Sequence, residues 1–77
     1  MTGYMYILRC SGNTYYTGST IDLERRIKEH QTGMGANYTR ERLPVTLAYF
    51  EEYDRIDLAF YREKQVQGWG DKRKKRL

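Results

Sequence analysis

An aromatic, strand-forming segment followed directly by a turn constrains the fold more than any other feature of the chain. Residues 4–10 read Tyr-Met-Tyr-Ile-Leu-Arg-Cys, and Ser11-Gly12-Asn13 then supplies turn-forming residues. A second short strand is predicted from Thr14 to Gly18, so the two strands form a β-hairpin with a connection slightly longer than the tightest two-residue turns. Four of the eight tyrosines fall within the first sixteen residues, so the hairpin is strongly aromatic.

A helix is predicted directly after the hairpin. Ser19-Thr20-Ile21-Asp22 is typical of a helix start, because Ser, Thr and Asp accept hydrogen bonds from the free amides of a first turn. The helix is expected to run to about Gln31, and Thr32-Gly33-Met34-Gly35 then ends it, with glycine free to adopt the left-handed conformation.

Two neighbouring stripes run along this predicted helix. Leu23 and Ile27 stand four residues apart, which places them on one apolar face that we expect to pack against the hairpin. Arg26 and His30 are also four apart and therefore share the adjacent stripe.

The rest of the chain predicts a loop, a strand and further helix. Residues from Gly33 to Pro44 lack a clear periodicity and are interpreted as a flexible, mildly basic loop. Val45 to Tyr53 alternates as a third strand, and a second helix is expected to run to about Gly68, followed by a packed Trp69. The expected helix caps are Asp54 or Asp57 for the second helix and Asp71 for a short third one.

The predicted order is β-β-α-β-α, with room for a short C-terminal helix. An α+β fold with a small, three-stranded, mostly antiparallel sheet flanked by helices buries these apolar faces most simply. A chain of 77 residues has room for only one core. We therefore predict a single domain over residues 1–77.

Charge is distributed unevenly along the chain. The formal net charge is +4, yet residues 1–70 hold nine Lys or Arg and nine Asp or Glu. All of the excess lies in residues 71–77, which carry five bases and one acid. Such a tail either contacts phosphates or forms a solvated face, and the sequence leaves both interpretations open.

Several functional classes find little support. Cys10 is the only cysteine and is expected to be a packing residue, so no cysteine pair for zinc exists, and neither does a phosphate-binding Gly-Lys loop. No apolar run approaches the ~18 residues that span a membrane, so we expect a cytoplasmic protein with no membrane partner. The remaining phenols, guanidinium, imidazole and carboxylates suit phosphodiester hydrolysis.

These groups stand in a recognisable order. Tyr4-Met5-Tyr6 and Tyr16-Thr17-Gly18, followed by a helix with Arg26 and His30, resemble the signature of the GIY-YIG nuclease superfamily. Tyr4 and Met5 replace the nominal Gly and Ile, while Glu63 matches the family's metal-binding glutamate. The resemblance spans residues 3 to about 76. The chain is similar to short stand-alone bacterial members and to the catalytic subunit of structure-specific junction and flap nucleases.

The resemblance implies a role for each of five residues. Tyr6 would orient or deprotonate the attacking water, and Tyr16 would hydrogen-bond the phosphate or share that role. A phenol has an ordinary pKa near 10, so a base role needs a nearby cation, which we expect His30 or the metal to supply. Arg26 would stabilise the phosphorane, and Glu63 would hold a single Mg²⁺ or Mn²⁺.

Further residues are candidates for substrate contact. Gly18 is expected to allow a close backbone approach, and Thr20, Arg40, Lys64 and the tail bases are expected to contact DNA. Each residue also has an ordinary structural explanation: strand tyrosines pack, and Glu63 could simply pair with Gln67 on its helix.

The resulting hypothesis is a metal-dependent endonuclease that hydrolyses DNA phosphodiester bonds, with branched or damaged DNA as its candidate substrates. One alternative is a catalytically weak nucleic-acid-binding module. Many family members continue to a polar residue, often Asn, near the active face, and its absence before Leu77 favours this alternative. The other is a partner-dependent nuclease subunit that takes its targeting from another protein.

Overall fold

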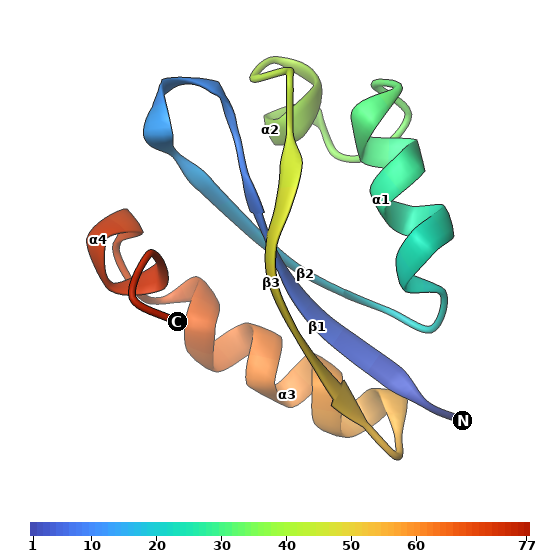
Figure 1. The fold of residues 1–77 in the computed structure, drawn as a ribbon. Helices are drawn as coiled ribbons and strands as arrows, with labels where there is room; N and C mark the ends of the chain where they lie inside the picture. Colours follow the sequence, from blue (N-terminus) through green and yellow to red (C-terminus); the bar gives the residue numbers. More distant parts are fainter.

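Three antiparallel strands form the centre of the structure, a computed structural model that describes residues 1–77 (Figure 1). The strand order is β2-β1-β3, with β1 at Gly3–Arg9, β2 at Tyr15–Thr20 and β3 at Thr46–Tyr53. The register places Tyr6 of β1 opposite Gly18 of β2. Because β1 lies between two neighbours, it is the most buried strand, while β2 and β3 each leave one edge without a neighbouring strand.

The two longer helices, α1 (Leu23–Gln31) and α3 (Ile56–Gln67), cover opposite faces of this sheet (Figure 1). Successive side chains of a strand point to opposite faces, and the core is accordingly divided in two. On one face Tyr6, Leu8, Cys10 and Val45 form a cluster against the α1 residues Leu23 and Ile27, as the sequence predicted. On the other face Met5, Ile7 and Tyr15 pack with Val66 of α3 and with Trp69, whose predicted packing is also confirmed.

The first helix has the predicted start and end. Asp22 is its N-cap, and its carboxylate accepts a hydrogen bond from the Arg25 amide at 3.2 Å. The helix ends at Gln31, and Gly33 follows with a φ of +81°, which glycine adopts without strain.

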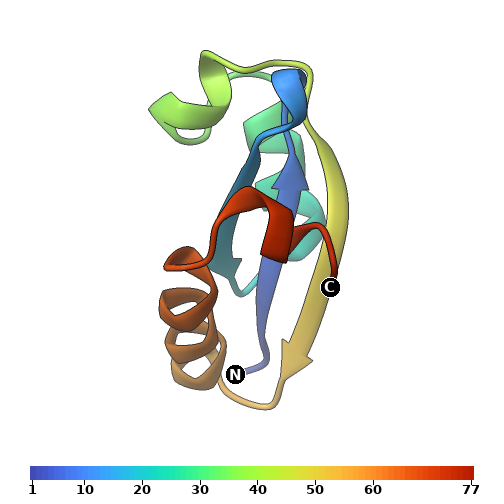
Figure 2. The ribbon, with the colours of Figure 1, turned by 90° about the vertical axis from the view of Figure 1, so that its left-hand side faces the viewer.

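The prediction of a flexible loop from Gly33 to Pro44 is wrong. A helical turn, α2 (Asn37–Arg40), forms within this segment, and Thr39 at its centre is fully buried. The backbone amide of Ser11 in the hairpin turn also donates to the Arg42 carbonyl at 3.0 Å. Both views show α2 at the same end of the molecule as the tip of the hairpin, consistent with this bond (Figures 1 and 2).

The predicted acidic caps of the later helices are also wrong. Arg55 is the N-cap position of α3 and makes no side-chain capping bond, while Asp57 pairs with the Arg55 guanidinium at 2.6 Å. The expected short C-terminal helix exists as α4 (Asp71–Lys74), but Asp71 accepts a hydrogen bond from the Tyr15 amide at 3.2 Å instead of capping it.

Part of the basic tail is packed against the domain. Lys74 is buried, and the Arg73 guanidinium lies over the Trp69 ring at 4.0 Å from its centroid. Lys74 is therefore integrated into the fold, whereas Arg73 stacks on Trp69 and stays exposed. No helix of the structure has the length and apolar character needed to cross a bilayer.

Candidate active site

A buried contact between a phenol and an imidazole lies at the centre of the candidate site. The Tyr6 hydroxyl on β1 is 2.8 Å from Nε2 of His30 at the end of α1, and both residues are almost fully buried. Gly18, opposite Tyr6 on β2, leaves the space for that hydroxyl, because a Cβ at Gly18 would overlap it. The group that approaches Gly18 closely is thus the Tyr6 hydroxyl of the protein itself.

The other side of the His30 ring is held by segment 33–44, which contains α2. Thr39 Oγ1 lies 2.8 Å from Nδ1 of His30. A Cβ at Gly35 would lie 2.8 Å from both Cγ and Cε1 of the ring, so glycine is needed there for the backbone to pass. Neither residue was among the predicted site residues, and no local pattern indicates them.

Burial sets the protonation of this pair. Burial lowers the pKa of His30 to about 4, and the positive charge of Arg26 acts in the same direction. Burial raises the pKa of Tyr6 to about 12, with Arg26 opposing it in part. His30 is therefore neutral at pH 7, and the expectation that it serves as the cation that lowers the Tyr6 pKa is wrong. Arg26 is the cation that acts on Tyr6.

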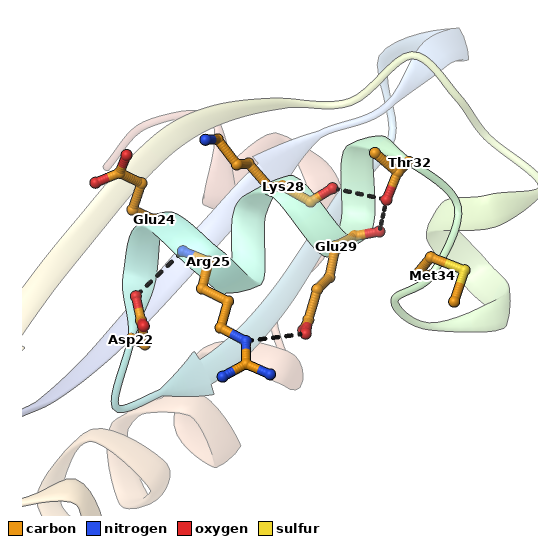
Figure 3. Close-up of a pocket in the computed structure, with 7 residues that line it drawn as sticks. All are labelled: Asp22, Glu24, Arg25, Lys28, Glu29, Thr32 and Met34. Carbon is orange, nitrogen blue, oxygen red and sulfur yellow. Dashed lines mark hydrogen bonds and ion pairs between the residues drawn. The ribbon is translucent and has the colours of Figure 1, made fainter.

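Arg26 is held by an acid one turn further along α1. Its guanidinium pairs with Glu29 at 3.0 Å, and its side chain is 33% exposed. Arg25 pairs with the other oxygen of Glu29 at 3.5 Å but is 76% exposed. Figure 3 shows Arg25 and Glu29 beside an open hollow on the outer surface of α1, with Asp22 and Met34 at its two ends. Glu29 thus orients Arg26 next to the tyrosines, while Arg25 faces solvent.

Tyr16 is the more accessible of the two candidate tyrosines. It is half-buried, its ring centroid lies 5.1 Å from that of His30, and its hydroxyl makes no hydrogen bond within the protein. Burial raises the Tyr16 pKa, and Arg26 opposes this shift. Its hydroxyl is therefore protonated at neutral pH and available to a ligand.

Glu63 of α3 lies against the edge strand β2, on the face opposite to Tyr6. Its carboxylate is largely buried and accepts hydrogen bonds from Ser19 Oγ at 2.5 Å and from Gln67 Nε2 at 2.9 Å. Gly18 and Ser19 are consecutive in β2, so Tyr6 approaches one face of the strand and Glu63 the other. The negative charge of Glu63 adds to the effect of burial on the pKa values of Tyr6 and Tyr16. The Tyr6–His30 pair and the Glu63 carboxylate thus lie on the two faces of β2 at its open edge.

The donor set around Glu63 is compatible with one weakly held metal ion. No group of three or more His, Cys, Asp or Glu side chains is arranged to hold a metal. Each Glu63 oxygen accepts one hydrogen bond and retains a second lone pair. A single carboxylate completed by water and substrate phosphates is a common way to bind Mg²⁺. The pairing with Gln67 considered from the sequence is present and leaves this capacity intact.

The remaining predicted contact residues are dispersed around the site. Thr20 and Glu63 both line a hollow between the end of β2 and α3, together with Ser19. Arg40 is exposed on α2, where it donates to Asn37 Oδ1 at 2.7 Å. Lys64 is exposed on α3, with its amine 4.8 Å from the centroid of the Phe60 ring.

The α+β fold and the candidate site at the edge of β2 indicate the class of protein. Residues 2–76 match the GIY-YIG catalytic domain, and the chain therefore belongs to this family, whose domain is a nuclease domain. Within the family it is similar to a UPF0213 protein of Haloquadratum walsbyi, at 45% identity over 96% of this chain and 83% of that protein. A UPF0213 protein of Natronomonas pharaonis is 43% identical over 96% of this chain and 87% of its own length.

A solved structure supports the same assignment of the fold. The solution NMR structure of a UPF0213 protein from Bacillus halodurans superposes with a TM-score of 0.60 at 39% identity. The match covers 100% of this chain and 82% of that protein. The predicted family and the predicted α+β architecture are both confirmed.

Proposed function

We propose that the protein is a metal-dependent endonuclease that hydrolyses DNA phosphodiester bonds at the open edge of β2. One observation carries this proposal. The buried Tyr6–His30 contact and the Glu63 carboxylate approach consecutive residues, Gly18 and Ser19, from opposite faces of one edge strand. A phosphodiester lying along that edge would reach both groups.

The proposed reaction is the attack of water on phosphorus. The water oxygen forms a bond to phosphorus as the bond to the leaving oxygen breaks. The water proton passes to the Tyr6 oxygen while Tyr6 passes its own proton to Nε2 of His30. Because the Tyr6 pKa is about 12, this coupled transfer avoids a free phenolate. A bound phosphodiester raises the His30 pKa by its negative charge. After the reaction the imidazolium returns its proton from Nε2 to the Tyr6 oxygen as Tyr6 gives up the proton that it took from the water.

Two groups in this proposal contact the phosphate. Arg26, oriented by Glu29, offsets the charge that develops on the non-bridging oxygens. The free Tyr16 hydroxyl donates a hydrogen bond to one of them. The leaving oxygen takes a proton from solvent.

Glu63 is the residue that would hold a single Mg²⁺ or Mn²⁺. When bound, such an ion offsets negative charge on the leaving oxygen. Ser19 and Gln67 fix the orientation of the carboxylate. Because one carboxylate binds such an ion weakly, we expect metal and DNA to bind cooperatively.

Branched, flapped or damaged DNA is the proposed substrate class. The partly buried Thr20 and the exposed Arg40 and Lys64 are proposed to contact flanking phosphates. A partner protein that targets the nuclease, and a cytoplasmic location, belong to the same proposal. The strongest support for a DNA substrate is membership of the GIY-YIG catalytic domain family.

The test is a cleavage assay with a matched pair of arginine variants. Purified protein is incubated with labelled flapped, branched and linear duplexes in Mg²⁺, Mn²⁺ or chelator. We expect metal-dependent cleavage that Arg26→Ala slows by about 100-fold and that the neighbouring Arg25→Ala leaves close to the wild-type rate. Binding without cleavage in either metal would identify a binding module instead. Cleavage that requires added cell extract would identify a partner-dependent subunit.

A further inference from the structure

Thr39 is a fully buried hydroxyl with two polar neighbours. Its Oγ1 lies 2.8 Å from Nδ1 of His30 and 3.0 Å from the carbonyl oxygen of Ala36. Both contacts fall within the ordinary range for hydrogen bonds.

Proton counting assigns the direction of each bond. A carbonyl oxygen carries no hydrogen, so the Thr39 hydroxyl must donate to Ala36. A hydroxyl has only one hydrogen, so Thr39 must accept from His30, and Nδ1 therefore carries the proton. If Thr39 donated to Nδ1 instead, two oxygens would face each other at 3.0 Å with no hydrogen between them.

The same proton count determines the hydrogen-bond direction at Nε2, the other ring nitrogen. A neutral imidazole with its proton on Nδ1 has a bare Nε2, so the Tyr6 hydroxyl at 2.8 Å donates to it. The backbone at Gly35 closes over the Nδ1 side of the ring, and Thr39 is the only hydrogen-bond partner of Nδ1.

We infer that Thr39 is a positioning residue whose hydroxyl holds His30 in the Nδ1–H tautomer, so that Nε2 can accept the Tyr6 proton. The inference rests on the proposed function for its link to cleavage, but the tautomer itself is a property of the free protein. In the other tautomer Nε2 carries a hydrogen, and the proton transfer from Tyr6 is blocked.

Two variants of Thr39 separate positioning from packing. Thr39→Ser keeps the hydroxyl, whereas Thr39→Val has nearly the same shape and lacks it. The ring nitrogens of His30, the only histidine, are observed by ¹⁵N NMR of labelled protein near pH 7, which distinguishes the two tautomers. Backbone amide spectra verify that each variant is folded.

The expected spectra are the Nδ1–H tautomer in wild type and in Thr39→Ser, and a shift of population toward Nε2–H in Thr39→Val. We expect the single-turnover cleavage rate of Thr39→Val to fall by about tenfold or more with unchanged DNA affinity. Thr39→Ser should retain the wild-type rate. A wild-type protein in the Nε2–H form would overturn the inference, as would a Thr39→Val spectrum identical to wild type.

The two proposals can fail separately. If wild type cleaves no DNA in any metal, the proposed function is wrong, and the NMR comparison still decides whether Thr39 sets the tautomer. If wild type cleaves DNA but Thr39→Val keeps both its rate and its tautomer, only the role of Thr39 is wrong.

Discussion

The Tyr6 hydroxyl lies 2.8 Å from Nε2 of His30, and the two side chains are 1% and 0% exposed. This contact joins the central strand of the sheet to the end of α1, residues that are 24 positions apart in the sequence. Because both side chains are almost fully buried, their protonation is set mainly by burial and by the neighbouring Arg26. The candidate site is therefore sensitive to changes that alter this packing.

The space at Gly18 is the most stringent packing requirement. A Cβ at this position would overlap the Tyr6 hydroxyl and lie 2.5 Å from its Cζ. We expect Gly18→Ala to lower the free energy of unfolding by roughly 1–3 kcal/mol and to displace Tyr6 from His30. Urea denaturation measures the first effect. Gly68→Ala is the control, since its Cβ would meet only the Gln65 carbonyl at 3.6 Å. Equal stability of the two variants would contradict the geometry at Gly18.

The neutral state of buried His30 predicts a pH dependence of stability. Its pKa falls from 6.5 to about 4 on folding, chiefly through burial, so between these values the unfolded chain binds a proton that the folded chain does not. The stability from neutral His30 is present above about pH 6.5 and is lost as the pH falls toward 4, by on the order of 3 kcal/mol.

Urea denaturation of wild type and His30→Gln from pH 7 to 4 isolates this contribution. The variant retains every carboxylate, so the difference between the two curves reports His30. We expect wild type to lose stability more steeply than the variant over this interval. Parallel curves would show that His30 titrates normally in the folded protein.

A second polar cluster ties β3 to α3, away from the candidate site. Glu51 accepts hydrogen bonds from the Tyr49 and Tyr53 hydroxyls, both at 2.5 Å, and from Arg62 Nε at 3.1 Å. Glu51→Gln should lower the free energy of unfolding by about 1–3 kcal/mol, because it removes charge-assisted acceptors for three donors. Thermal or urea unfolding measures this loss of stability. The exposed neighbour provides the control, and Glu52→Gln should change stability by no more than about 0.5 kcal/mol. Equal losses in both variants would show that the cluster is not stabilising.

The elements that could be predicted from the sequence are those with local signals. The hairpin, the first helix with its Asp22 cap and the third strand all follow from patterns within their own segments. Segment 33–44 could not be predicted, because its helical turn is stabilised by partners elsewhere in the chain. His30 bonds to Thr39, and Ser11 bonds to Arg42. The Asp71 carboxylate likewise accepts a hydrogen bond from the distant Tyr15 amide instead of capping its own helix.

The candidate site shows the same division. Tyr6, Tyr16, Arg26, His30 and Glu63 were identified by their order and spacing, and the structure brings them to one strand edge. The neutrality of His30 could not be predicted, because it depends on burial that only the folded chain defines. The contributions of Gly35 and Thr39 depend on how segment 33–44 packs on the His30 ring and carry no sequence signal of their own. Glu29 stands three residues after Arg26 on the helix, a spacing that allows an ion pair and could have indicated its role.

The central claim is that Tyr6 and Glu63, on opposite faces of β2, act on one phosphodiester. The most direct test is the single-turnover DNA cleavage rate of wild type, Tyr6→Phe, Glu63→Gln and the double variant, each confirmed to be folded. We expect the cleavage rate of each single variant to fall by about 100-fold or more. The rate of the double variant should be little lower than that of the slower single variant, because the two groups serve one chemical step. Single variants with wild-type rates, or losses that multiply in the double variant, would contradict a single site across this strand.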